Sequence, residues 1–461
     1  MDRHGAFSTM VVAAFLLSGQ GAASEEMSPA PILSLDEAIA IALAQHPRVE
    51  RSRFESLAAE DGVRAARSNY YPWVAVEGIA KDGLSGATGG LGLVGLPGSP
   101  FFDKLAIGVN VSFNALDFGR TRNAVDAARF TAASLRSREE AEKAAVVWQV
   151  RTAYYRGLQA EELLQVARET LEARELTARQ ARVYYEAELR SKLDASFSEV
   201  RVKEAEAELI RAENQQQLEF AALDLAMGVP GEGAYRLEAT PADSEPVESL
   251  EALVERSLLS RPDLAAAHLE AQAVQASLAA ARSERLPQIR AVASFGKARF
   301  AEGVDGKDWV VGVGFTVPVF TGFALDSRIH QAESRLRAAQ AGQKAIVQRV
   351  RFEVQRAFLD LETARSLTEV ARAQVSLAEE SLRLATQRYA AQLGSFIDLT
   401  ASDLSLVRSK QAHAQAVYDV MIARATLEFV VGEPAPHSAR SKAVVARDSA
   451  SSRLPRNGPT R

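Results

Sequence analysis

The chain repeats itself, and this internal repeat constrains the fold more than any other feature of the sequence. Early in each half the equivalent residues lie 215 positions apart, and further along they lie 204 positions apart. The clearest equivalences are Ala-Ala-Arg-Ser at 65–68 and 280–283, then Leu35 and Leu250, Pro47 and Pro262, Pro72 and Pro287, Ala153 and Ala357, Tyr185 and Tyr389, and Gly228 and Gly432. The 11-residue difference falls between Pro72 and Gly108. One length change in one loop therefore explains the alignment, and two copies of one structural unit are predicted.

Each copy has the same predicted order of elements. Ser34 to Glu37 has the spacing of a capping box, which predicts a helix start. A short helix to about Gln45 and a second helix from about Val49 to Asn69 follow, then two strands, one very long helix and a shorter helix. We predict a first repeat over 24–228, a linker with several prolines over 229–248, a second repeat over 249–432 and a disordered tail over 433–461.

The N-terminus predicts export. Residues 1–23 contain an apolar stretch from Met10 to Leu17 and end in three small residues, the pattern of a cleaved signal peptide. The chain has no cysteine, so neither disulfides nor an N-terminal lipid is expected. Beyond residue 23 no apolar run approaches the roughly 20 residues of a transmembrane helix. If the chain spans a membrane, strands must do so.

Four segments have the pattern of membrane strands, at about 72–82, 105–116, 287–300 and 308–319. In the second and fourth, bulky apolar residues alternate with small or polar ones. Segments of about 10 residues suit tilted transmembrane strands, although a soluble hairpin packed on helices is an alternative. Four strands cannot close a barrel and open edges are not tolerated in lipid, so several protomers must contribute strands. A glycine-rich surface loop is predicted from Asp82 to Pro100.

The remaining sequence is typical of long, paired helices. Residues 101–229 contain no proline, and Gly157 is the only glycine between Arg120 and Met227. A helix from Arg120 to Glu186 would be about 100 Å long, and the flanking helices at 49–69 and 192–227 nearly match it if stacked end to end. The positions that keep a 3–4 spacing, as in a left-handed coiled coil, are Leu361, Ala364, Thr368, Ala371, Val375, Ala378, Leu382, Ala385 and Tyr389. The fold class is therefore mostly α, a duplicated long-helix coiled coil with four β-strands; a solid rod without a pore is the alternative.

Several motifs resemble those of the TolC family of outer-membrane efflux proteins, over nearly the whole mature chain. They are Leu35 to Ile39 with His46-Pro47, 65–67 before Pro72, Leu116 to Arg120, more weakly Phe320 to Gly322, and Arg388-Tyr389 with Ser395 and Asp398. The resemblance implies a homotrimer with one 12-stranded barrel in the lipid of the cell outer membrane and a helical tube (an α-barrel) in the periplasm. It also implies a passive exit duct of a tripartite efflux or type I secretion system, working with a periplasmic adaptor (membrane fusion) protein and an inner-membrane transporter.

The family narrows its pore at the periplasmic helix tips with acidic side chains and tyrosine-centred hydrogen bonds. By position, Asp398 is the candidate constriction carboxylate, and Tyr185, Tyr389 and Asp194 are latch candidates. A ring of like charges in a narrow pore favours cations. Ser191 with Asp194, and Ser395 with Asp398, also have the spacing of capping boxes with Asp in place of Glu. Both roles stay open at this point, and they can coexist.

The sequence departs from the family at both turns. The family usually has glycine three residues after the tyrosine, where this chain has Glu188 and Gln392. The first turn has Arg190 but the second turn has no arginine, and Ala401 stands where some relatives have a second carboxylate. The resemblance therefore leaves the ion selectivity of the gate open.

Other functions find little support in the sequence. With 54 basic and 59 acidic residues there is no electrostatic reason to expect nucleic acid as a partner. The six histidines form no pair with metal-ligand spacing, and no phosphate loop or nucleophile motif occurs, so neither a cofactor nor an enzymatic activity is expected. The main alternative is an exported coiled-coil scaffold without a pore, which would be soluble without detergent.

Overall fold

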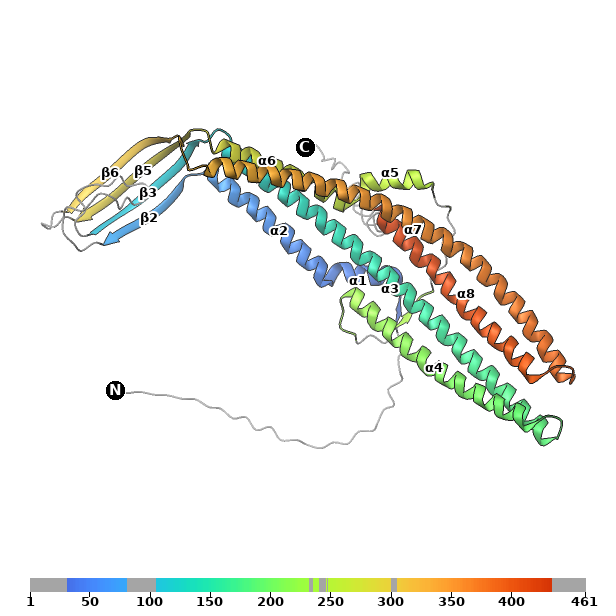
Figure 1. The fold of residues 1–461 in the computed structure, drawn as a ribbon. Coiled ribbons are helices and arrows are strands. Elements are labelled where there is room, and N and C mark those ends of the chain that lie inside the picture. Colours follow the sequence, from blue (N-terminus) through green and yellow to red (C-terminus); the bar gives the residue numbers. More distant parts are fainter. Residues whose placement is uncertain are drawn as a thin grey trace, which may run out of the picture.

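The computed structural model describes residues 31–80, 105–231, 235–239, 246, 248–299 and 305–432. The expected signal peptide at 1–23, the expected glycine-rich loop at 82–100 and the expected tail at 433–461 lie outside these residues. The described part is a long, thin molecule in which helices run side by side and a curved sheet extends from one end (Figure 1).

The same order of elements occurs twice. The first copy contains α1 (Leu35–Gln45), α2 (Pro47–Arg67), the 3-10 helix η1 (Ser68–Tyr70), β2 (Trp73–Ala80), β3 (Leu105–Leu116), α3 (Arg120–Glu186) and α4 (Lys192–Met227). The second contains α5 (Leu250–Ser260), α6 (Pro262–Ser283), β5 (Gln288–Arg299), β6 (Asp305–Thr316), α7 (Ala324–Ala390) and α8 (Phe396–Val431). Both long helices have 67 residues and both return helices have 36. The backbone repeats too, because the described residues with positive φ pair at an offset of 204: Phe118 with Gly322, Gly119 with Phe323, Glu188 with Gln392 and Gly228 with Gly432.

In each copy, specific side chains cap the start of the short first helix or fix the joint between it and the next helix. The capping box predicted at Ser34 is present: the Glu37 amide donates to Ser34 Oγ at 3.3 Å and the Ser34 amide donates to Glu37 Oε2 at 3.1 Å. Pro47 is the first residue of α2, where its missing N–H costs nothing. His46 caps that helix, since its Nδ1 accepts from the Arg48 amide at 3.1 Å.

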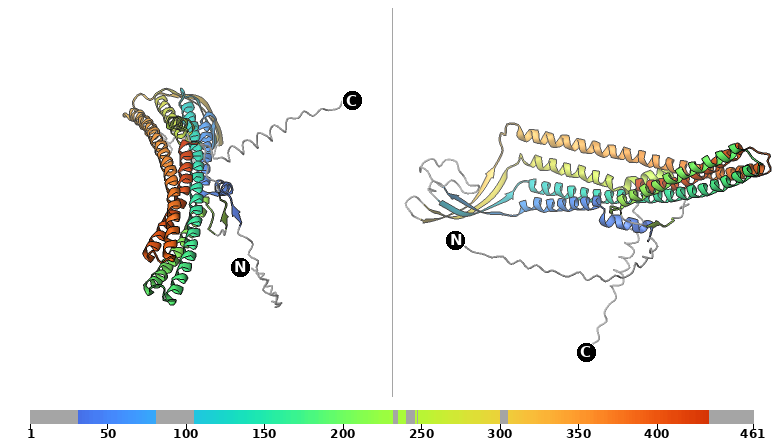
Figure 2. Two further views of the ribbon diagram at one scale, coloured as in Figure 1. Left: turned by 90° about the vertical axis from the view of Figure 1, so that its right-hand side faces the viewer. Right: turned by 90° about the horizontal axis from the view of Figure 1, so that it is seen from below.

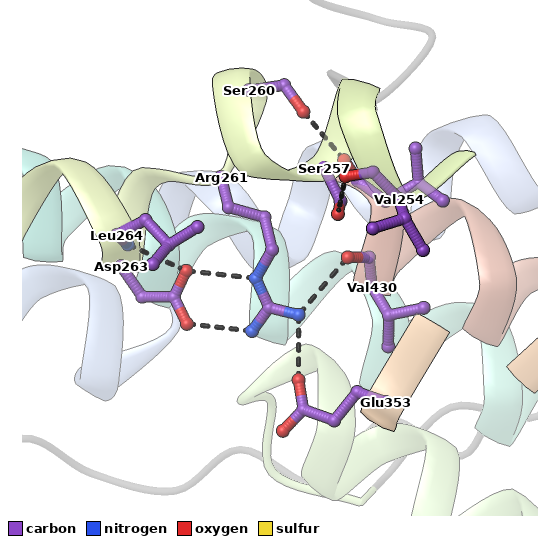
Figure 3. A network of polar contacts seen from close by, with 9 residues as sticks. Val254, Ser257, Ser260, Arg261, Asp263, Leu264, Glu353 and Val430 are labelled. Carbon is purple, nitrogen blue, oxygen red and sulfur yellow. Dashed lines mark hydrogen bonds and ion pairs between the residues drawn. The ribbon is translucent and has the colours of Figure 1, made fainter. Parts of the chain in front are cut away.

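The equivalent joint in the second copy is built on Arg261 (Figure 3). Its guanidinium donates to both carboxylate oxygens of Asp263, at 3.0 and 2.7 Å, and to Glu353 on α7 at 2.7 Å. It also donates to the Val430 carbonyl oxygen near the end of α8, at 3.1 Å. One guanidinium, whose side chain is only 10% exposed, thus fastens the α5–α6 joint to the long helix α7 and to the return helix α8 of its repeat.

The helix α3 is the centre of the packing. Near the sheet it lies between α2 and α6, and towards the far end it lies between α4 and α8 (Figures 1 and 2). The expected end-to-end stacking of α2 and α4 along α3 is therefore observed. The predicted coiled-coil positions of α7 face α8: Leu361, Ala364, Ala371 and Ala378 are buried, and Thr368 Oγ1 donates to the Ala416 carbonyl oxygen at 3.0 Å.

A small belt packs against the middle of α3. There β1 (Ile32–Leu33) pairs in parallel with β4 (Arg236–Leu237). The hydroxyl of the fully buried Tyr154 lies 2.9 Å from the carbonyl oxygens of both Leu33 and Glu238. The strand β4 lies inside the predicted linker at 229–248, which is therefore not irregular throughout. A two-residue strand carries no periodicity by which the sequence could reveal it.

The four-stranded sheet is antiparallel in the order β2-β3-β5-β6, so β2 and β6 are its edges. Its bulky apolar face is exposed: the exposed fractions are 57% for Ile107, 69% for Trp309 and 72% for Val313. On the other face Asn110 and Ser294 are buried. This is the reverse of a soluble sheet, so the alternative of a hairpin packed on the helices is wrong. Among the helices of the described segments, none is both long and apolar enough to cross a membrane.

Strand boundaries differ from the predictions in two places. The fourth strand spans Asp305–Thr316 instead of about 308–319, because Pro318 has no N–H to donate to the ladder and the partner strand begins at Gln288, opposite Thr316. The first strand begins at Trp73 and its described part ends at Ala80. On the small-residue face Gly108 lies opposite Gly296, and a Cβ on either would come within 3.0 Å of the opposing backbone. The two glycines therefore permit a close approach that curves the sheet.

Candidate gate at the helix tips

The two helical hairpins, α3–α4 and α7–α8, end in turns of the same geometry. In the first turn the Leu189 amide donates to the Tyr184 carbonyl oxygen and the Glu188 amide donates to that of Tyr185, both at 2.9 Å. The residues Gln392 and Leu393 make the same two bonds in the second turn. This is a Schellman motif, in which the residue after the C-cap adopts a left-handed conformation that favours glycine. Glu188 (φ 58°) and Gln392 (φ 60°) occupy that position here. The glycine that the family usually has is therefore replaced at two positions where the backbone is strained for any other residue.

Each return helix begins with a serine cap. The Asp194 amide donates to Ser191 Oγ at 3.3 Å and the Asp398 amide donates to Ser395 Oγ at 3.1 Å. Only the second turn completes the capping box, because the Ser395 amide donates to Asp398 Oδ2 at 3.3 Å. The capping role considered from the sequence is thus fully present at Asp398 and half present at Asp194. Asp398 is nevertheless exposed, so its charge still faces solvent in one chain.

The two equivalent tyrosines have different surroundings. Tyr389 is 7% exposed and packs with Phe396 and Leu399, whereas Tyr185 is 42% exposed. Burial raises the pKa of Tyr389, and the nearby negative charge of Asp194 adds to the shift. The Tyr389 hydroxyl is buried, and among the described residues it has no hydrogen-bond partner. Its phenol therefore stays protonated and acts through its ring and its backbone.

An arginine of the first hairpin holds Tyr389 of the second. The Arg190 guanidinium carbon lies 4.2 Å from the centroid of the Tyr389 ring, and Nη2 donates to the Tyr389 carbonyl oxygen at 2.5 Å. A cation over an aromatic face, combined with a charge-assisted hydrogen bond, stabilises the contact more than either alone. We refer to this contact between the two turns as the Arg190 clamp. Sequence reasoning noted Arg190 but did not assign it this contact.

A second contact joins the hairpins further from the turn. Arg174 on α3 donates through Nε to Asp403 Oδ2 on α8 at 3.1 Å, and its side chain is only 11% exposed. Beside it the four helices enclose a cavity of about 170 Å³, lined in part by Thr177, Tyr389 and Thr400. Neither Arg174 nor Asp403 was a candidate from the sequence. In a chain with 54 lysines and arginines, no local pattern marks those that reach across to the other repeat.

Taken together, the tips hold Tyr389, Arg190, Ser395 and Asp398 in fixed positions, with exposed acidic groups and no reactive pair. Within the described part of the chain, histidines and acids form no cluster that could hold a metal ion. The geometry suits a mechanical and electrostatic constriction. The predicted latch of tyrosine-centred hydrogen bonds is not formed by the Tyr389 hydroxyl in the described part of a single chain, although the charge of Asp194 contributes to raising the pKa of Tyr389, and Tyr185 is exposed.

Duplicated long hairpins that continue into a sheet with an exposed apolar face are the fold of an outer-membrane channel protein. The family model described as outer membrane efflux protein matches residues 38–229 and 253–433. The chain belongs to the outer membrane efflux protein family, and the TolC-like resemblance is confirmed. It is an efflux channel protein of the outer membrane, with its helical part in the periplasm.

Known relatives agree with this fold. Outer membrane protein OprJ of Pseudomonas aeruginosa is 30% identical over 242 residues, which cover 50% of this chain and 49% of OprJ. The match thus spans about half the length of that relative. The outer membrane protein VceC of Vibrio cholerae has 20% identity and a TM-score of 0.74, covering 86% of this chain and 96% of VceC. The open state of the Neisseria gonorrhoeae MtrE channel has 22% identity and a TM-score of 0.71, covering 86% and 88%.

Proposed function

We propose that three copies of this chain close into one cylinder that passively conducts substrates out of the cell. A periplasmic adaptor protein and an inner-membrane transporter deliver the substrates and supply the energy, and the chain itself does no chemistry. The observation that carries this proposal is the sheet with two unpaired edges and an exposed apolar face. In lipid such edges must be paired, and pairing β6 of one copy with β2 of the next satisfies both.

The internal repeat indicates which helices meet between copies. Within one chain α3 of the first repeat packs on α8 of the second. The equivalent of α3 in the second repeat is α7, and the equivalent of α8 in the first repeat is α4. The same contact between neighbouring copies would therefore join α7 of one chain to α4 of the next. We call this the subunit seam. If the seam copies the internal contact, residues on α7 and α4 that are equivalent to buried residues on α3 and α8 must be apolar and must lack cover in a single chain.

The exposed residues of α7 and α4 fit this expectation. Trp148 of α3 stacks on Phe429 of α8 with ring centroids 5.2 Å apart. Their equivalents are Phe352 on α7, 63% exposed, and Leu225 on α4, 77% exposed. The same holds for Val166 and Ala414, which are buried, and for their equivalents Val370 and Ile210, which are 53% and 66% exposed. Apolar side chains at these positions favour a second copy as the occupant.

The tip residues then form the constriction of this cylinder. Three Asp398 side chains would lie in one ring and favour cations, while Ser395 holds each aspartate at its helix start. Tyr389 and Asp194 contribute to the latch, with Ser191 capping the neighbouring helix. Tyr185 is exposed in a single chain, and its equivalence to Tyr389 supports a place for it at the subunit seam.

The test joins assembly to conduction. Purified protein in detergent is expected to have the mass of a trimer and to form cation-selective channels in planar bilayers. Phe352→Glu is expected to abolish the trimer by burying a charge at the seam. Adding Leu225→Lys to the same chain should restore it, because the new charges face each other. A wild-type chain that is monomeric in plain buffer without detergent would contradict the proposal and favour the scaffold without a pore.

A further inference from the structure

The end of the sheet furthest from the helices carries two lysines that face each other on neighbouring strands. In the antiparallel register of β5 and β6, Lys297 lies opposite Lys307, and both residues are exposed. The next pair in this register, Arg299 with Asp305, has opposite charges. Within the described part of the chain, neither lysine forms an ion pair. Like charges directly opposite each other destabilise a sheet, so an anion from outside the chain would stabilise this pair.

The lysine pair shares its face of the sheet with exposed aromatic and aliphatic residues. Side chains alternate along a strand, so Lys307 lies on the same face as Trp309 and Val311. Phe295 lies directly opposite Trp309, and the exposed fractions of the two residues are 52% and 69%. An aromatic pair is therefore the immediate neighbour of the lysine pair, on the side nearer the helices.

The length of the apolar band gives the level of the lysines relative to the membrane. Exposed apolar residues occur at alternate positions from Trp309 to Val319. At about 3.3 Å per residue and a tilt of about 45°, this stretch covers about 24 Å, which is close to the roughly 25 Å apolar band of transmembrane barrels. Lys307 lies just beyond Trp309, and therefore at the level of the lipid headgroups.

The connections of the strands identify the leaflet. Because α6 precedes β5 and α7 follows β6, Lys297 and Lys307 lie near the strand ends that point away from the helices (Figure 1). The helical part is in the periplasm. The lysine pair is therefore on the side of the outer leaflet, whose lipid in an outer membrane is a phosphorylated glycolipid.

We propose that the pair of Lys297 and Lys307 in each copy binds a phosphate group of this outer-leaflet glycolipid. The inference rests on the proposed barrel, in which this face of the sheet is turned to lipid. Two ammonium groups on adjacent strands can donate to one phosphate, and such charge-assisted hydrogen bonds are stronger than neutral ones. Acyl chains of the same molecule lie along Trp309 and Phe295, so the surface recognises a phosphate that is attached to a lipid.

Lipid binding to the purified protein tests this. Protein freed of lipid in detergent is titrated with lipid A that carries two phosphates, and native mass spectrometry counts the bound molecules. One tightly bound lipid per chain is expected. The double substitution Lys297→Gln and Lys307→Gln should weaken binding about tenfold or more, because two charge-assisted hydrogen bonds are lost. Replacing both lysines by arginine should retain binding.

The same strand offers a matched control. Arg290 on β5 is also exposed, but it shares its face with the buried Ser294 and not with the apolar band. Arg290→Gln removes one cation from the sheet and should leave lipid binding unchanged. A loss of affinity in Arg290→Gln equal to that of the double variant would mean that only the total charge matters, and would overturn the proposal.

A charge reversal separates binding from folding. Lys307→Glu places opposite charges across the two strands, which favours the sheet, so this variant should fold and assemble like the wild type. It should nevertheless lose the bound lipid. Lipid A should therefore raise the melting temperature of the wild type and leave that of Lys307→Glu unchanged. An equal rise in both proteins would contradict a role for the lysine pair.

Two further ligands identify the recognised group. Lipid A without its phosphates should bind about tenfold or more weakly, and inorganic phosphate at the same concentration should not displace the phosphorylated lipid. Equal binding of the dephosphorylated lipid would overturn the proposal, because the acyl chains alone would account for it. Displacement by inorganic phosphate would overturn it too, because the lysines would then bind a free anion. Each lysine pair lies within one chain, so a protein that binds lipid A but stays monomeric would contradict only the proposed trimer.

Discussion

Arg190 lies over the ring of Tyr389, 199 residues away in the chain, and donates to that residue's carbonyl oxygen. The contact uses an aromatic face and a backbone acceptor, so it leaves the buried Tyr389 hydroxyl unused. It fixes the turn of one hairpin to the last residues of the other long helix. The strength of this contact sets how independently the two tips of one chain can move.

Removing the clamp should loosen the tip. Arg190→Ala is expected to cost about 2 kcal/mol of local stability, the sum of a charge-assisted hydrogen bond and a cation–π contact. Because this contact joins the two turns of one chain, its loss frees them to separate, and bilayer recordings should show more frequent openings. Arg190→Lys retains the charge but not the planar guanidinium, so its opening frequency should lie between those of the wild type and Arg190→Ala. Openings as rare as in the wild type would rule out a mechanical role for Arg190.

The strained turns provide a stabilising substitution. Glu188→Gly and Gln392→Gly should each stabilise their turn by about 1 kcal/mol, because glycine adopts positive φ without the Cβ clash. Hydrogen exchange at the Leu189 and Leu393 amides, which donate inside these turns, should slow accordingly. Ala187→Gly is the control, since Ala187 has φ −84° and glycine there should only loosen the turn. Faster exchange in Glu188→Gly would contradict the explanation.

The cap and the charge of Asp398 can be separated. Asp398→Asn keeps an oxygen that can accept from the Ser395 amide but removes the charge, and is expected to weaken block by divalent cations from the periplasmic side. Ser395→Ala removes the cap and keeps the charge, so it should cost about 1 kcal/mol of helix stability with block retained. If block is unchanged in Asp398→Asn, Asp398 is a helix cap and not a gate residue.

The α1–α2 joint should weaken in acid. Burial, followed by the charge of Arg48, lowers the pKa of His46 below its ordinary 6.5, and its Nδ1 must be unprotonated to accept from the Arg48 amide. Since the pKa is lower in the folded protein, the stabilisation is complete above about pH 6.5 and is lost as the pH falls through the folded value. Hydrogen exchange at the Arg48 amide should accelerate on acidification. His46→Asn, a cap that does not titrate, should show no such pH dependence.

The sequence predicts the repeated order of elements well, and the reason is physical. In a duplicated chain, each boundary between elements can be inferred from two copies. The predicted bounds of α3, Arg120 and Glu186, are correct, and the absence of proline between them indicated one continuous helix. The errors lie where pattern carries no information. Two-residue strands such as Ile32–Leu33 have no periodicity, and the start of β6 at Asp305 depends on its pairing with Arg299.

The candidate gate was only partly visible for a related reason. Equivalent positions in two repeats look alike in sequence, yet Tyr389 is buried under Arg190 while Tyr185 is exposed. The difference arises because the α3–α4 hairpin covers the side of the second repeat on which Tyr389 lies, whereas nothing within one chain covers the equivalent side of the first repeat, on which Tyr185 lies. Contacts such as Arg174 to Asp403 join residues 229 positions apart and appear only once the hairpins are packed.

The identical lengths of the paired helices limit how such a protein can change size. Deleting one heptad from α3 alone would retract that hairpin by about 10 Å while its twin kept its full reach. Arg190 would then lose its contact with Tyr389, and the two serine-capped turns would lie at different distances from the sheet. A lineage that needs a shorter or longer conduit must therefore alter both copies together, so insertions in these helices should be found in matched pairs at corresponding positions.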